Sequence, residues 1–129
     1  MKAAYVASSW VVAIAFGEAG HAGLLAEVDR YDRLYSSALL EAELWAACRR
    51  EGVPQDRELL AQVNWVLPDR PLSEELGVVL DAGYLRGADA WHVACALFLA
   101  RVPGSMSFLT LDEAQGSVAG ALGFEIPSR

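Results

Sequence analysis

Three acidic residues stand out, because each occupies a position where a carboxylate is costly or conspicuous. Glu43 has apolar neighbours three and four positions away on a predicted helix, so its carboxylate needs a cation, a proton or a hydrogen-bond donor. Asp89 opens the most apolar helix of the chain, and Asp112 follows a predicted strand. If the three converge, an all-oxygen cluster without His or Cys ligands suits Mg²⁺ or Mn²⁺, hard cations that assist phosphoryl chemistry.

Each of these acids also has a purely structural explanation. Glu43 can turn out to solvent or pair with an arginine, and aspartate is a favoured helix cap, which would account for Asp89. Asp112 forms a plausible capping box with Gln115. His92 has no histidine partner at metal-ligand spacing, and we expect it in the core or beside the site. If the acids are only caps and surface charges, asparagine at 89 and 112 leaves metal affinity unchanged.

The elements that must position these acids alternate between strands and helices. An apolar run over 3–7 predicts a buried strand, and Ser8-Ser9 leads into a short helix over 10–16. Helical spacing over 19–31, a strand over 33–36 and a helix over 38–50, capped by Ser37 and ended by Gly52, come next. The remaining predicted elements are a helix with apolar face Leu59, Leu60, Val63 and Val66, a helix from Ser73 to about Gly83, a buried helix over 88–102, a strand over 106–110, a short helix after Asp112 and an edge strand over 124–126.

Strands separated by helices predict parallel pairing through right-handed crossovers. We therefore expect an α/β chain, a three-layer α/β/α sandwich with a mainly parallel sheet of four or five strands and Val6-Ala7 on a central strand. Ligands bind such sheets at the carboxyl ends of the strands, where Glu43, Asp89 and Asp112 are expected to meet.

Length and composition indicate one domain over 1–129. The chain is 54% hydrophobic and 21% charged, enough for one substantial core. Its net charge of −7 excludes a general basic surface that coats nucleic acid but permits a local site. Nine of the ten basic residues are arginines, which suit phosphate contacts but equally serve as partners for surface acids.

Two cysteines and the N-terminus bear on the compartment. Cys48 and Cys95 lie in separate apolar stretches and are expected to be buried thiols in a reducing compartment. Lys2 and the apolar run 10–16 imitate a secretory signal, but Ser8-Ser9 interrupts the pattern. No run is long enough to cross a bilayer. We expect a cytoplasmic protein with no membrane association.

Four blocks of the chain resemble the PIN-domain family, and within it the VapC-type toxins. They read Tyr5-Val6-Ala7-Ser8-Ser9, Glu41-Ala42-Glu43-Leu44, Ala88-Asp89-Ala90-Trp91-His92-Val93-Ala94-Cys95-Ala96 and Leu109-Thr110-Leu111-Asp112. The resemblance covers essentially the whole chain, and the third block is the most specific. The family has an aspartate where this chain has Ala7.

The resemblance implies divalent-metal-dependent hydrolysis of RNA by the toxin of a toxin–antitoxin pair. Glu43, Asp89 and Asp112 would hold the metal, and Ser9 would support the site through its hydroxyl. Ala7 marks the missing ligand, so the chain is expected to be catalytically impaired. An introduced inactivating substitution and a naturally inactive homologue both account for it.

The implied partners are a cognate antitoxin, an RNA substrate and a second copy of the chain in a homodimer. An arginine or lysine of the antitoxin would enter the acidic pocket. A PIN-like module that binds RNA or protein without cutting is the alternative. A nucleotide-binding or phosphatase enzyme of another α/β type has no motif support, since the chain lacks G-x-G-x-x-G and the P-loop.

Overall fold

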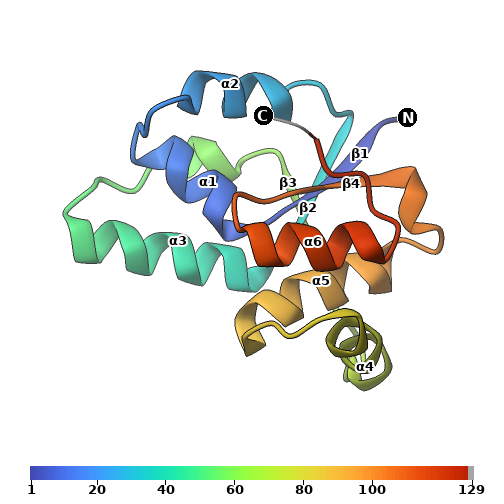
Figure 1. The fold of residues 1–129 in the computed structure, drawn as a ribbon. Coiled ribbons are helices and arrows are strands. Elements are labelled where there is room, and N and C mark those ends of the chain that lie inside the picture. The colour runs from blue at the N-terminus through green and yellow to red at the C-terminus, as the bar shows by residue number, and fades with distance from the viewer. Residues whose placement is uncertain (128–129) are drawn as a thin grey trace.

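Short apolar strands, each leading towards a helix, build the chain in the computed structural model, which describes residues 1–127. Figure 1 shows the arrangement. The elements are β1 (Ala3–Val6), α1 (Ser8–Ala15), α2 (His21–Val28), β2 (Arg33–Ser37), α3 (Ala38–Glu51), the 3₁₀ helix η1 (Arg57–Leu60), β3 (Val63–Val66), α4 (Ser73–Ala82), α5 (Gly87–Leu99), the 3₁₀ helix η2 (Pro103–Ser105), β4 (Met106–Leu109) and α6 (Glu113–Ala121).

The strands of the described chain form one four-stranded, all-parallel sheet in the order β3-β2-β1-β4. The prediction of a parallel α/β/α sandwich is confirmed. β1 pairs with β2 on one side and β4 on the other, so Ala7 follows the end of a central strand. The carboxyl ends of all four strands therefore lie along one edge of the sheet.

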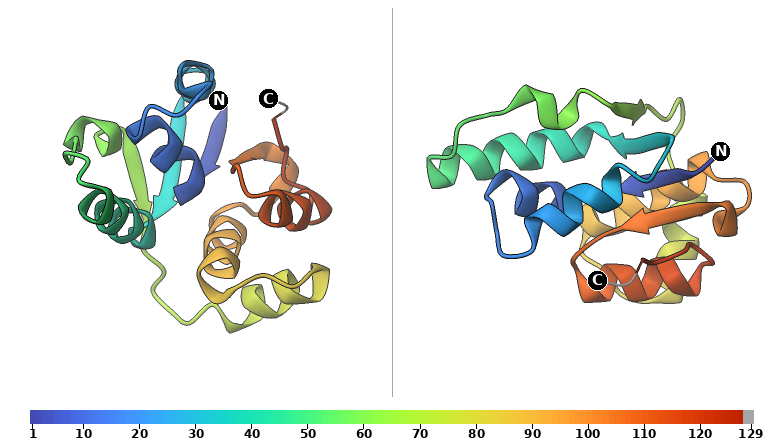
Figure 2. Two further views of the ribbon diagram at one scale, coloured as in Figure 1. Left: turned by 60° about the vertical axis from the view of Figure 1, so that its left-hand side comes forward. Right: turned by 90° about the horizontal axis from the view of Figure 1, so that it is seen from above.

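Side-chain alternation along β1 divides the core into two layers. Ala4 and Val6 pack into a cluster with residues of α1, α2 and α3, whereas Tyr5 packs with residues of α4, α5 and α6. Successive side chains of a strand point to opposite faces, so these two helix groups cover opposite faces of the sheet. Figure 2 shows the two groups on either side of the strands.

Local signals set the limits of the helix that carries Glu43. The Ser37 hydroxyl accepts a hydrogen bond from the Leu39 amide at the start of α3, and Gly52 ends the helix at φ +66°. Both features were predicted. Six consecutive or near-consecutive residues of α5 are buried, which confirms its place inside the fold.

One predicted element was wrong in kind, and another is shorter than predicted. Leu59 and Leu60 belong to η1, while Val63 and Val66 belong to the edge strand β3, so no helix spans them. Pairing with β2 satisfies the backbone of β3, which outweighs the helical spacing of its apolar residues. The predicted last strand shrinks to one bridge, in which Glu125 pairs with Ser107 at the outer edge of β4.

The lengths of the helices and the state of the two cysteines bear on the remaining expectations. Within residues 1–127, none of the helices combines the length and the apolar character required to traverse a bilayer. Cys48 and Cys95 are both buried, and neither forms a disulfide. Burial raises the pKa of the Cys95 thiol to about 12, so this thiol stays protonated and inert.

Candidate active site

The carboxyl end of β1 carries a methyl group where the sheet could present a polar side chain. Ala7 is buried, with 1% of its surface exposed, and occupies the cap position of α1 without a side-chain capping bond. Its amide donates to the Leu109 carbonyl at 2.9 Å, which fixes the backbone between β1 and β4. The side chain at this central position therefore contributes no ligand atom.

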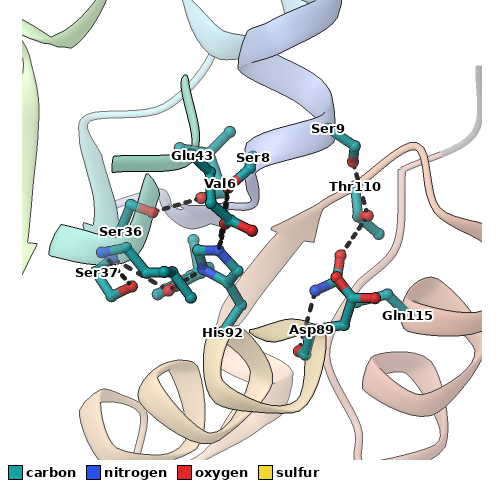
Figure 3. A network of polar contacts seen from close by, with 12 residues as sticks. Val6, Ser8, Ser9, Ser36, Ser37, Glu43, Asp89, His92, Thr110 and Gln115 are labelled. Atoms are coloured by element: carbon teal, nitrogen blue, oxygen red, sulfur yellow. Dashed lines mark hydrogen bonds and ion pairs between the residues drawn. The ribbon is translucent and has the colours of Figure 1, made fainter. Parts of the chain in front are cut away.

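Glu43 lies beside that position, within a chain of hydrogen bonds drawn in Figure 3. Its Oε1 accepts from the Ser8 hydroxyl at 2.5 Å and lies 2.9 Å from Nε2 of His92. The other ring nitrogen of His92, Nδ1, lies 2.8 Å from the Tyr5 hydroxyl. The Tyr5 oxygen in turn accepts from the Ser37 amide at 3.1 Å. The carboxylate is thus anchored to four elements of the fold.

The direction of these bonds follows from the donors that are available. Because the Tyr5 oxygen already accepts from the Ser37 amide, its hydrogen can point to Nδ1 of His92, which leaves Nε2–H to donate to Glu43. Burial raises the pKa of Tyr5, so the phenol keeps this proton. The hydrogen bond from His92 lowers the pKa of Glu43; burial opposes this effect, and the Ser8 bond adds to it. Glu43 is therefore held as a carboxylate.

Ser9 joins the start of α1 to the end of β4. Its hydroxyl oxygen accepts from the Leu111 amide at 2.9 Å and lies 3.2 Å from the Thr110 hydroxyl. Thr110 also accepts from the Asp112 amide at 3.0 Å. Ser9 therefore shapes the turn that carries Asp112, and its role in supporting a metal site stays a prediction.

Gln115 connects this turn with the start of α5. Its side-chain oxygen accepts from Thr110 at 2.6 Å, and its side-chain nitrogen donates to the Asp89 carbonyl at 3.1 Å. The Asp112 carboxylate accepts from the Gln115 amide at 2.8 Å, which confirms Asp112 as a helix cap. The capping box is only half formed, because the Gln115 side chain is drawn to Thr110 and Asp89 instead of back to Asp112.

Asp89 is not a helix cap. Arg86 occupies the cap position of α5, so Asp89 lies in the first turn. Its pKa is raised, first because it is partly buried and then because the charges of Asp112 and Glu43 repel it; His92 and Arg86 oppose the shift. The charges of Glu43 and Asp112 thus both act on Asp89.

These acids do not form a ready-made metal cluster. Across the described chain, no group of three or more His, Cys, Asp or Glu side chains could hold a metal ion. The donor chemistry nevertheless fits a hard divalent cation, since carboxylate oxygens are its preferred ligands and a positive charge would relieve the repulsion at Asp89. The ligand roles of Glu43, Asp89 and Asp112 stay predictions.

Sequence reasoning missed several residues that shape the site. Ser8 belongs to the Ser-Ser pair noted in the sequence, and its neighbour Ser9 alone was assigned a role. Tyr5 and Gln115 were read as strand and cap residues. His92 is buried and meets the carboxylate of Glu43, in agreement with its expected place beside the site.

Comparison with families of known proteins agrees with this arrangement. The PIN domain, which is generally a metal-dependent nuclease domain, matches residues 4–121. No curated protein and no solved structure matches the chain significantly. The matched segment runs from β1 to α6 and includes both networks around the acidic residues. The chain therefore belongs to the PIN domain family.

Proposed function

We propose that this PIN domain is an Mg²⁺-dependent endoribonuclease of the toxin type, working in a toxin–antitoxin pair, and that Ala7 impairs the present chain. The supporting observation is geometric: Gln115 ties the first turn of α5, which carries Asp89, to the turn that carries Asp112. In keeping with this, the pKa of Asp89 is raised, first by burial and then by the charges of Asp112 and Glu43. Neighbouring carboxylates at the carboxyl edge of a parallel sheet, one of them repelled by the others, are what a site for a divalent cation and a phosphodiester requires.

Each residue of the site has a distinct task in this proposal. Glu43, Asp89 and Asp112 would hold the cation, which when bound supplies an activated water and neutralises charge on the phosphate. His92 and Ser8 keep Glu43 ionised and fixed through their hydrogen bonds. Gln115 and Ser9 hold the backbone on which Asp89 and Asp112 stand, as described above.

Restoring an aspartate at position 7 tests the proposal. Ala7→Asp should give RNA cleavage that requires Mg²⁺ and disappears with a chelator, because it adds a carboxylate beside Glu43 at the end of β1. Ala7→Asn is the matched control, since it adds the same shape without the charge. Calorimetry should show tighter Mn²⁺ binding by the aspartate form than by the other two. Equal metal affinity and no cleavage in a folded Ala7→Asp protein would refute the mechanism.

A non-catalytic PIN module that binds RNA or protein is the second candidate. It is favoured by the satisfied state of Glu43, whose carboxylate already has two hydrogen-bond partners, and by the absence of a three-residue metal group in the described part of the chain. This candidate predicts that Ala7→Asp binds RNA as the parent chain does and cleaves none. The same assay therefore separates the two functions.

The proposed partners are an antitoxin and a second copy of the chain. Tyr84 and Leu67 are 83% and 73% exposed, and Val78 and Leu80 of α4 are about half exposed, which is consistent with surfaces that a partner covers. Co-expression with the neighbouring reading frame should yield a complex, and the free chain should elute as a dimer. The cytoplasm is the proposed compartment, in keeping with the buried thiols.

A further inference from the structure

A hollow lies apart from Glu43, Asp89 and Asp112, at the edge of the sheet formed by β3. Its volume is about 480 Å³, and α3, η1 and β3 together line it. Two indoles, Trp45 and Trp65, share this hollow with Arg57 and Glu41. Such a set of side chains is chemically unlike the buried core beneath it and is not used by the site described above.

The hollow lies near the edge of the sheet that carries the acids. Trp65 pairs with Ser36 near the carboxyl end of β2, and the Ser36 hydroxyl donates to the Val6 carbonyl at the end of β1. Neighbouring strands lie about 4.8 Å apart, so β3 is about 10 Å from β1. A single strand of RNA whose phosphate reaches the acids could therefore place a nearby base in this hollow.

Two features of the indoles favour a flat ligand. Trp65 is 36% exposed on an edge strand, so part of this residue is in contact with water. Trp45 packs partly against the core cluster below α3 and turns its remaining surface to the hollow. Stacking a nucleobase on such rings is a common means of binding single-stranded RNA.

The opposite charges of Glu41 and Arg57 in the hollow favour a neutral ligand over a cation or an anion. Among the described residues, neither Glu41 nor Arg57 is joined in an ion pair. A quaternary cation would suit the indoles and Glu41, but Arg57 would repel it. An anion would suit Arg57, but Glu41 would repel it. A neutral ring that offers both donors and acceptors meets neither penalty.

We propose that this hollow is a nucleobase subsite for single-stranded RNA and that it selects guanine. Guanine presents O6 and N7 as acceptors for the Arg57 guanidinium and an exocyclic N2 amine as a donor to the Glu41 carboxylate. Trp65 supplies the stacking surface, with Trp45 beside it. The inference rests on the proposed function, because it assumes that RNA is the ligand of the neighbouring acidic site.

Nucleotide titrations with the Ala7 chain, in the presence of chelator, test the subsite. Tryptophan fluorescence and calorimetry should show tighter binding of GMP than of AMP, CMP or UMP. Trp65→Ala should weaken GMP binding roughly tenfold or more, whereas Trp65→Phe should retain most of it, since both indole and phenyl rings stack. Val102→Ala is the control, because it shortens an exposed apolar side chain outside the hollow and should leave GMP affinity unchanged.

Inosine monophosphate tests the Glu41 contact, because it lacks only the N2 amine. The parent chain should prefer GMP to this analogue severalfold, and Glu41→Ala should abolish the preference while binding the analogue normally. Circular dichroism establishes that each variant is folded. Equal GMP affinity in Trp65→Ala and parent, or equal binding of all four nucleotides, would overturn the subsite.

The titration is independent of the nuclease assay. It uses neither metal nor cleavage, so GMP binding that is lost with Trp65→Ala would support the subsite even if Ala7→Asp fails to cut RNA. Conversely, cleavage by Ala7→Asp without guanine binding would uphold the nuclease and refute the subsite.

Discussion

Glu43 and Asp89 lie in opposite electrostatic surroundings at the carboxyl edge of the sheet. Glu43 receives hydrogen bonds from Ser8 and His92, and its pKa is lowered, chiefly by the bond from His92. Asp89 is partly buried and repelled by Asp112, and its pKa is raised. The ionised carboxylate is thus stabilised by hydrogen bonds at Glu43 and destabilised by burial and repulsion at Asp89.

The cause of this difference is the number of donors that the surrounding elements supply. Glu43 faces α1 and α5, from which a hydroxyl and an imidazole reach it, and β1 supports the imidazole through Tyr5. Around Asp89 the bonds serve the backbone: Gln115 donates to its carbonyl and not to its carboxylate. We infer that hydrogen bonds hold the Glu43 carboxylate in place without a cation. A bound cation would stabilise the Asp89 carboxylate more, because that carboxylate has fewer donors.

The largest expected effect comes from removing the centre of the satisfied side. His92→Ala deletes the donor to Glu43 and the acceptor for Tyr5 and leaves a cavity around a side chain that is 1% exposed. We expect the free energy of unfolding to fall by about 3 to 4 kcal/mol, measured by urea denaturation. Gln115 and the Asp89 side should keep their contacts. A loss below about 1 kcal/mol would show that the network is not organised around His92.

The next prediction tests whether a further carboxylate beside Glu43 and Asp89 destabilises the fold. Ala7→Asp should lower the free energy of unfolding by about 2 kcal/mol in chelator, because a buried carboxylate joins Glu43 and Asp89 and a new capping bond offsets only part of the cost. Saturating Mn²⁺ should restore the loss. Ala7→Asn, which caps without charge, should show neither change. Equal stability of the Asp and Asn forms in chelator would contradict the repulsion.

Breaking the Asp89 side should cost less. Gln115→Leu removes the hydrogen bonds to Thr110 and to the Asp89 carbonyl. The leucine side chain still fills this position, which is 2% exposed. We expect a loss of about 1 to 2 kcal/mol in denaturation experiments. Ser117→Leu, an exposed change on the same helix, serves as the control. If Gln115→Leu costs as much as His92→Ala, the two sides do not differ as described.

Much of the fold could be predicted because its signals are local. A serine cap and a glycine stop bound α3, and an apolar run marks the buried α5. The error over 59–66 arose because apolar residues there fit helical spacing, while the deciding factor was pairing with β2, a long-range contact. The predicted strand over 124–126 is shorter in the structure, because a local apolar pattern does not determine how far a segment pairs with the sheet. Only one bridge, between Glu125 and Ser107, forms there.

The sequence singles out the acidic residues, whose ligand roles stay predictions, but it does not reveal their hydrogen bonds. Glu43 and Asp89 could be identified because a carboxylate beside apolar residues is unusual in any sequence. The bonds of Ser8 to Glu43 and of Tyr5 to His92 span 35 and 87 positions, so they depend on how the sheet brings distant segments together. The role of Gln115 was hidden because its spacing from Asp112 matched a local capping box.

The smallest expected effect tests the comparison most sharply, because neutralising Asp89 and neutralising Glu43 should change the free energy of unfolding in opposite directions. In chelator at neutral pH, Asp89→Asn should stabilise the chain and Glu43→Gln should destabilise it, each by about 0.5 kcal/mol, a figure kept small because water screens both half-buried groups. The pKa of Asp89 is raised above its ordinary value of 3.8, so its penalty is present at neutral pH and is lost as pH falls through that raised pKa towards 3.8. The pKa of Glu43 is lowered below its ordinary value of 4.5, so its contribution is present above 4.5 and is lost as pH falls through the lowered pKa. Both differences from the parent should therefore shrink on acidification, from opposite sides of zero, in denaturation series from pH 7 downwards. Differences of the same sign would show that the two carboxylates share one environment.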